Sequence, residues 1–217
     1  MPHASEPAVL VMHALRLKGL ALPEAVATAA GLDEPEVSRL LTGLHNDGLV
    51  TFREGRLAGW SLTAAGRAEH AGCIRAEVRA AAVTDDIEKC YRRFLELNGE
   101  LLAVATAWQI REVGDETVVN DHTDVVYDAS VVDRLRTLHA NVAPALDDLG
   151  GLLDRMSRYA ARFGHALERV EAGDQEWFTR PVIDSYHTIW FELHEDLLVT
   201  LGRERAQEPD DGAREGR

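Results

Sequence analysis

The chain has 217 residues, of which 46% are hydrophobic and 28% charged, and its formal net charge is −14 at pH 7. These values are ordinary for a globular protein of one large or two small domains. We find no apolar run long enough to span a membrane and no signal-peptide pattern at the first residues, so we expect a cytoplasmic protein with no membrane contact.

The acidic residues are unevenly distributed. Residues 1–70 hold six Lys and Arg against eight Asp and Glu, a net charge of −2, so −12 of the total falls on the remainder. Because carboxylates repel phosphate groups, any contact with nucleic acid is expected within residues 1–70.

Three short helices are predicted at the start of the chain. The spacing of apolar residues predicts helices over Glu6–Lys18 and Leu22–Ala30. Asp33 is expected to cap a third helix, which Asp47-Gly48 would end. The apolar residues of this third helix fall on one face and are expected to be buried; they are Val37, Leu40, Leu41 and Leu44.

A β-hairpin is predicted next, over residues 50–63. Two short β-favouring runs flank Glu54-Gly55, and Thr63 is expected to cap a further helix. The order of three helices, hairpin and helix predicts a winged helix-turn-helix domain over residues 1–70.

Two segments of this domain, GLDEPEVSRLLTGLHNDGLVTF and WSLTAAGR, resemble the winged-helix domain of bacterial MarR-type transcriptional regulators. The resemblance implies binding to double-stranded DNA, with the third helix in the major groove and the hairpin along the backbone. It also implies a homodimer.

The polar face of the third helix and the hairpin supply the candidate DNA contacts. These are Ser38, Arg39, Thr42, His45 and Asn46 on the helix, with Arg53 and Arg56 on the hairpin. Such side chains hydrogen-bond bases or phosphates. The alternative is that they are solvated side chains of a module that packs on another protein.

Residues 71–203 are predicted to form an antiparallel helical bundle that serves for dimerisation and for binding a ligand or partner. Helices are expected over 64–82 and 84–111, as one helix or as two with a bend near Val83-Thr84. A loop would follow at 112–128. Asp128 or Ser130 would then cap a helix that Pro144 bends or ends early, before a tight connection at Gly150-Gly151. Residues 204–217 are polar and expected to be disordered.

Two clusters in this region are candidates for a ligand or partner pocket. His187, Trp190 and His194 share one helical face, where aromatic rings suit apolar ligands and imidazoles provide polar contacts. His122 and Tyr127 lie in the predicted loop, and Trp108 is expected to approach the helical face of His187, Trp190 and His194. The alternative is that the helical face belongs to the core. We expect no metal, because His187 and His194 are about 10 Å apart along a helix.

A second resemblance covers most of the chain. The segments WQI, NDHTDVVYD and RPVIDSYHTIWFELHEDLL are similar to a helical tail of actinobacterial proteins. Some of those proteins are described as transcriptional regulators, and others are fused to pyruvate phosphate dikinase-like enzymes that use phosphoenolpyruvate. Two functions therefore stay open. One is a dimeric DNA-binding regulator, with or without a small-molecule effector, and the other is a non-catalytic interaction subunit for such an enzyme. The sequence lacks common catalytic and cofactor-binding motifs, so neither an enzyme nor a cofactor is expected.

Overall fold

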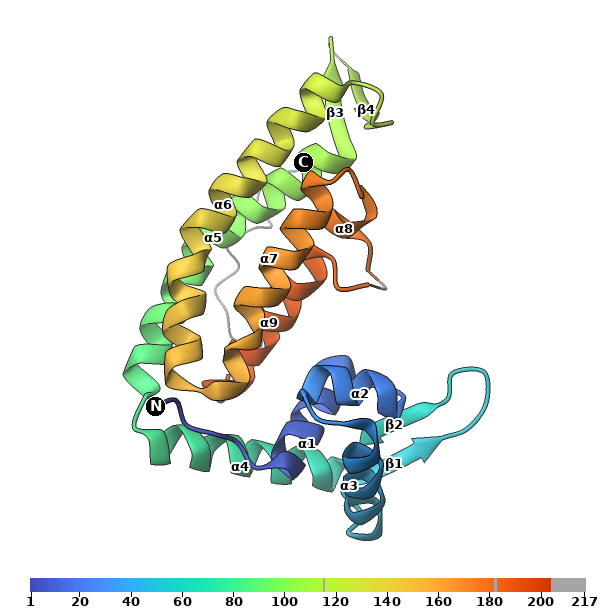
Figure 1. Ribbon diagram of the computed structural model, residues 1–217, viewed down its shortest axis with the longest axis vertical. Coiled ribbons are helices and arrows are strands. Elements are labelled where there is room, and N and C mark those ends of the chain that lie inside the picture. The colour runs from blue at the N-terminus through green and yellow to red at the C-terminus, as the bar shows by residue number, and fades with distance from the viewer. Residues whose placement is uncertain (115, 182, 204–217) are drawn as a thin grey trace, which may run out of the picture. The chain divides into compact units, whose positions relative to one another are not determined.

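The structure is a computed structural model that describes residues 1–114, 116–181 and 183–203. It is mainly helical, as predicted, with two small antiparallel hairpins (Figure 1). The described chain divides into two compact units. Unit 1 comprises residues 1–84, 152–155 and 195–203, and unit 2 comprises residues 85–151 and 156–194. Each unit is therefore assembled from segments that are distant in the sequence.

Unit 1 begins with the predicted order of three helices, a hairpin and a fourth helix. The elements are α1 (Pro7–Lys18), α2 (Pro23–Ala30), α3 (Glu34–Asn46), β1 (Val50–Arg53), β2 (Gly59–Leu62) and α4 (Ala64–Ala81). Proline stands in the first turn of α1, α2 and α3, where a missing N–H costs little. The Glu36 amide donates to Asp33 Oδ1 at 2.8 Å, which confirms the predicted cap.

Helices α1, α2 and α3 pack on one another around a shared apolar core. Its fully buried side chains are Val11, Val26, Val37 and Leu41, with Leu15 almost as deep. Leu40, which the sequence placed on the same buried face, is only partly buried. The link between α1 and α2 also joins the hairpin, because Ala21 and Trp60 exchange two backbone hydrogen bonds of 3.0 and 2.7 Å.

The first turn of α4 is seated on the chain that leads into β1. The Thr63 hydroxyl donates to the Gly48 carbonyl and accepts from the Gly66 amide, which confirms Thr63 as a cap. A Cβ atom at Gly66 would lie 1.9 Å from the Leu49 carbonyl oxygen. Arg67 donates to the Leu62 carbonyl at 2.9 Å. The segment LTAAGR therefore fixes where the hairpin leaves α3 and where α4 begins.

Four long helices make up most of unit 2. They are α5 (Thr84–Gln109), α6 (Val125–Leu152), α7 (Arg158–Glu171) and α9 (Tyr186–Thr200), with the short helices Asp154–Met156 and α8 (Glu176–Thr179) between them. Helices α5 and α6 run antiparallel, since ion pairs join Arg93 to Asp148 and Arg134 to Glu100. The last turns of α9 and residues 152–155 belong to unit 1.

The loop predicted at residues 112–128 is wrong. Strands β3 (Ile110–Val113) and β4 (Glu116–Val119) form a hairpin there, with Ile110 opposite Val119. Gly114 has φ +66°, the left-handed backbone that two-residue hairpin turns require. The Gly and Asp residues of this segment favour a loop, but the β-branched residues that flank them favour strands.

The boundaries of α6 also differ from the prediction. It begins at Val125, one turn before the expected caps Asp128 and Ser130, and Asp124 Oδ1 accepts from the Tyr127 amide at 3.0 Å instead. The helix continues through Pro144 and includes Gly150 and Gly151, so neither residue pattern ends it. Between α4 and α5, by contrast, a break does occur, at Ala82 with φ 54°. The predicted disorder at 204–217 lies outside the described residues.

None of the helices in the described part of the chain has the length and apolarity that a membrane crossing requires.

The close contact of Gly66 in α4 with the Leu49 carbonyl gives a prediction about stability. Gly66→Ala forces a Cβ into the Leu49 carbonyl, so we expect the free energy of unfolding to fall by about 3 kcal/mol in urea titrations followed by circular dichroism. Gly43→Ala is the matched control, because its Cβ meets nothing within 4 Å on α3. There the gain in helix propensity is expected to stabilise by up to about 1 kcal/mol. Equal changes in the free energy of unfolding for the two variants would contradict the close contact between Gly66 and Leu49.

Candidate functional site

Helix α3 presents a polar row on the side opposite its buried residues. Val37, Leu41 and Leu44 are buried. Ser38, Arg39, Thr42 and Asn46 are exposed, as the sequence predicted for candidate DNA contacts. The Thr42 hydroxyl donates to the Ser38 carbonyl at 2.9 Å, which leaves its oxygen lone pairs available as acceptors.

His45 has a different role from its neighbours in the polar row. Its Nδ1 lies 3.1 Å from the Val50 carbonyl, which only accepts, so Nδ1 must donate. Its ring also meets the Trp60 ring edge-on, at 5.6 Å between centroids. His45 therefore connects the end of α3 to the hairpin. Its side chain is also exposed, so a direct contact of His45 with DNA stays a prediction.

The hairpin places two arginines beside α3, which contacts β1. Arg53 ends β1 and Arg56 lies in the turn that follows, and both are exposed. Phe52 packs against Trp60 with 5.2 Å between ring centroids, so the strand is held from one side by an aromatic pair. The structure thus brings together all seven predicted contacts as exposed side chains on α3 and the adjacent hairpin.

Acidic groups lie close to this surface. Arg39 is 71% exposed and its Nη2 is 3.7 Å from Glu36 Oε1, a long and weak ion pair. Glu34 also stands in the first turn of α3, and Asp47 follows its last turn. Carboxylates in the first turn stabilise the helix through a favourable interaction with its dipole, but they also weaken the attraction of the surface for phosphate.

The predicted pocket of unit 2 is not one site. Trp190 is fully buried, and its ring stacks on Phe94 at 4.5 Å. His194 is 7% exposed and lies 5.6 Å from the same Phe94 ring. These two residues belong to the core, the alternative that the sequence left open. His187 lies partly exposed beside Phe191, and burial lowers its pKa.

Trp108 belongs to a second cluster, at the other end of α5. It is 14 residues from Phe94, about 21 Å along the helix axis. Its ring contacts His122 at 4.5 Å and Phe178 at 5.1 Å. The predicted set therefore divides between two places, because its members contact different parts of the long helix α5.

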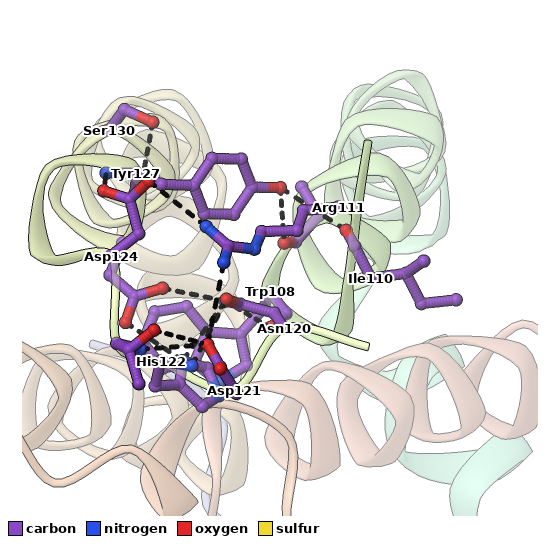
Figure 2. Close-up of polar contacts among 12 residues, drawn as sticks. Trp108, Ile110, Arg111, Asn120, Asp121, His122, Asp124, Tyr127 and Ser130 are labelled. Atoms are coloured by element: carbon purple, nitrogen blue, oxygen red, sulfur yellow. Dashed lines mark hydrogen bonds and ion pairs between the residues drawn. The ribbon is translucent and has the colours of Figure 1, made fainter. Parts of the chain in front are cut away.

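The second cluster is a polar network at the base of the β3–β4 hairpin, and Figure 2 shows its side chains converging between α6 and the end of α5. Asn120 is buried and its amide donates to the Trp108 carbonyl at 3.1 Å and to Asp128 Oδ1 at 2.8 Å. His122 Nδ1 lies 3.0 Å from Asp128 Oδ2, and the residue has a φ of 59°. The tyrosine hydroxyl of Tyr127 donates to the Ala107 carbonyl at 2.8 Å.

This network holds the hairpin in place. Arg111 lies 3.1 Å from Asp124 and 3.7 Å from Asp121, so its guanidinium bridges two loop carboxylates. Its Nε is the one buried side-chain polar atom of the described residues that lacks a hydrogen-bond partner. An Asp–His pair also occurs in catalytic sites, where it orients a base toward a nucleophile. Here every member of the network described above joins hairpin, α5 and α6 to one another, which is a structural use.

A third polar cluster, which the sequence analysis missed, is buried in unit 1. Arg155 Nη1 lies 2.5 Å from Asp196 Oδ1, its Nε 3.2 Å from Glu77 Oε2, and its Nη2 2.7 Å from Thr200 Oγ1. His13 Nε2 lies 3.1 Å from Asp196 Oδ2. Asp196 and Thr200 stand one turn apart on α9, at positions where an apolar pattern would place core residues. That spacing was the available signal.

The charges of this buried cluster depend on each other. Burial alone would raise the pKa of Asp196, but Arg155 and His13 beside it hold that pKa below its usual value. His70 Nε2 lies 3.0 Å from His13 Nδ1. Burial, with His13 and Arg155 nearby, lowers the pKa of His70 from 6.5 to about 3. His70 is therefore neutral in the folded protein at physiological pH.

The lowered pKa of His70 predicts that acid destabilises the protein. Between pH 6.5 and about 3 the unfolded chain binds a proton on His70 that the folded chain does not, so stability is lost as the pH falls through this window. His70→Gln keeps a polar group at the Nε2 position and should flatten the dependence of unfolding free energy on pH, measured by urea titration from pH 7 to 4. His165→Gln, at an exposed histidine, should leave the dependence unchanged.

The core position of Trp190 gives a separate prediction. Trp190→Ala should lower the free energy of unfolding by about 4 kcal/mol, because it removes a fully buried ring. Phe191→Ala, at the exposed neighbouring position, should cost about 1 kcal/mol or less. Similar losses in thermal unfolding would show that Trp190 is not the core residue of this helix.

Among the described residues, no group of three or more His, Cys, Asp and Glu side chains is arranged to hold a metal ion. Comparisons with models of known protein families, with curated proteins and with solved structures found no match to this chain. A function for this protein therefore has to be argued from the surfaces and clusters described above.

Proposed function

We propose that unit 1 contains a winged helix-turn-helix domain and that the protein is a DNA-binding regulator of transcription. The observation that carries the proposal is the exposed polar row of α3 next to an exposed pair of hairpin arginines. Helices α2 and α3 would form the helix-turn-helix, and β1 with β2 the wing. The long helices of unit 2 would form an antiparallel bundle for dimerisation and effector binding.

The side chains of the α3 row suit the major groove. A bare α-helix fits this groove, and α3 has a buried row that holds it on the domain and a polar row that stays accessible. The Arg39 guanidinium can donate two hydrogen bonds to O6 and N7 of guanine. The Asn46 side-chain amide can donate to N7 of adenine and accept from its N6. Ser38 and Thr42 are short enough to let the helix approach closely.

The wing would contact the phosphate backbone. Arg53 and Arg56 are exposed, and arginine binds phosphate oxygens through two parallel N–H donors. Because His45 and Trp60 connect α3 to β1 and β2, the two surfaces keep a fixed spacing. A fixed spacing lets one domain engage a groove and its adjacent backbone together.

The small number of arginines on α3 and the hairpin determines how strongly this surface is expected to bind DNA. Few cations face the DNA and carboxylates lie nearby, so non-specific affinity should be low and recognition should depend strongly on the few arginines. A homodimer would double the number of contacts, with half-sites about one helical turn apart. Dimerisation and a small-molecule effector are part of the proposal, and sedimentation of the full chain tests the first.

Binding to DNA can be tested without knowing the operator. Selection from a random pool of double-stranded DNA at 50 mM salt should enrich one sequence, to which Arg39→Ala combined with Arg53→Ala binds at least about 100-fold more weakly, because two charge-assisted contacts are lost. The slope of log affinity against log salt should fall by about 1 for each phosphate contact removed. Binding is measured by fluorescence anisotropy.

The matched control is Arg79→Ala combined with Arg92→Ala. Both arginines are exposed, on α4 and α5, so this variant lowers the net charge equally without touching α3 or the hairpin. Its affinity should stay within about twofold of the unaltered chain if binding is local. A selection that enriches no sequence, or equal losses in the two variants, would contradict the proposal.

A second candidate function has a specific observation in its favour. Phe52 is 40% and Leu57 64% exposed on the same hairpin, and apolar side chains there suit a protein surface as well as DNA. Under this alternative the protein is a non-catalytic interaction subunit, and unit 1 packs on a partner such as a phosphoenolpyruvate-utilising enzyme. Loss of partner binding in Leu57→Ser, with no selected DNA sequence, would favour it.

A further inference from the structure

The β3–β4 hairpin of unit 2 exposes an apolar pair on one of its faces and the single apolar side chain of Val113 on the other. Ile110 and Val119 stand opposite each other across the two strands, and they are 39% and 79% exposed. Arg111, the next residue, points to the other face, toward Asp121 and Asp124 (Figure 2). Neighbouring residues of a strand alternate between faces, so Ile110 and Val119 share the outer face with the Glu112–Thr117 pair, which is joined by a 2.7 Å hydrogen bond.

The outer edge of β4 has no strand beside it among the described residues, because this sheet has only two strands. The backbone N–H of Asn120 donates to the Gln109 carbonyl at 2.8 Å. Since ladder bonds in antiparallel pairs alternate, the next bonded pairs inward are Arg111–Val118 and Val113–Glu116. The backbone groups of Thr117 and Val119 therefore face outward. On β3, by contrast, the Ile110 carbonyl lies near the Tyr127 hydroxyl, at 3.4 Å.

The hairpin is rigidly held although its strands are short. Two four-residue strands are marginal by themselves in water. The network of Asn120, Arg111 and Tyr127 fixes their base to α5 and α6, as described above. An edge that is ordered before binding loses little conformational entropy when another strand pairs with it. The structure thus maintains an exposed strand edge that folded proteins usually shield.

The charge around this edge selects the kind of molecule that would cover it. Residues 110–128 contain one arginine and six Asp and Glu, a net charge of −5. Such a surface repels DNA, RNA and anionic lipid. It also repels a second copy of the same hairpin. It attracts a segment that presents Lys or Arg beside apolar residues.

We propose that β4 accepts an extended basic segment of another protein as a third strand. Apolar side chains of that segment would cover Ile110 and Val119 on the outer face, and its Lys or Arg side chains would lie on the face that carries Glu116. Main-chain hydrogen bonds to Thr117 and Val119 would provide affinity, and the alternating side chains specificity. This interaction is independent of the DNA contacts proposed for unit 1.

A synthetic peptide tests the strand pairing on the full-length protein. The probe is a nine-residue peptide with blocked ends that alternates Val and Lys, titrated at 150 mM salt with binding followed by NMR amide shifts. We expect saturable binding and slowed hydrogen exchange at the Thr117 and Val119 amides. The same peptide carrying N-methyl groups on two adjacent central residues, one Val and one Lys, keeps its charge but has one N–H removed on each edge, so it should bind at least about tenfold more weakly.

Variants on the two faces separate the apolar contact from charge attraction. Ile110→Thr combined with Val119→Thr keeps β-branched side chains at both positions, so the hairpin is retained while the apolar surface is lost. It should weaken peptide binding about tenfold. Val113→Thr is the matched control on the inner face, where Val113 is 52% exposed, and should leave binding within about twofold.

Three results would overturn the proposal. Equal binding of the N-methylated peptide, or of a scrambled peptide of the same composition, would show charge attraction without strand pairing. Equal binding by the Ile110/Val119 double variant would show that the outer face is not used. Self-association in sedimentation equilibrium that the double variant abolishes would assign the edge to a second copy of this chain.

Discussion

The carbonyl group of Leu49 is the point on which the exposed surface of unit 1 depends. It lies between the end of α3 and the start of β1, and the first turn of α4 closes over it because Gly66 has no side chain. Thr63 and Arg67 on either side bond to neighbouring carbonyls, so the hairpin leaves α3 in one direction only. Removing this close approach would alter the relation between the polar row of α3 and the two hairpin arginines. The possible functions of that surface therefore follow from a contact that lies beneath it.

Charged groups have three different roles in this protein. Arg155 and Asp196 form a buried pair in unit 1, and their removal from water costs free energy. The pair and its partners connect four segments of the chain. Arg111 is partly exposed and orders a hairpin. Arg53 is exposed and supports the proposed contact with phosphate. Sequence position alone does not separate these roles, because each arginine is flanked by both polar and apolar residues.

Local signals predicted unit 1 well and long-range ones were beyond reach. Asp33, Thr63 and the apolar rows act within a few residues, so the caps, the hairpin and the exposed contacts on α3 followed from spacing. The bond of His45 to the Val50 carbonyl could not be predicted, because that carbonyl comes from the next element. In unit 2 the sequence did not predict the β3–β4 hairpin. It placed Trp190 in a pocket, since the burial of a helical residue depends on which other helices cover it, and the sequence does not show that. The Arg155 cluster joins residues up to 183 positions apart, His13 and Asp196, and periodicity does not report such contacts.

The interleaved composition of unit 1 has a consequence for biosynthesis. The apolar cluster of its first three helices and hairpin lies within residues 11–62, but the charges that complete the interior of the unit arrive with residue 155 and residue 196. A nascent chain that has emerged only as far as α4 presents Glu77 and His13 without these partners. The ribosome must therefore translate past residue 200 before unit 1 reaches its final packing, even though its first helices and hairpin form from local sequence much earlier.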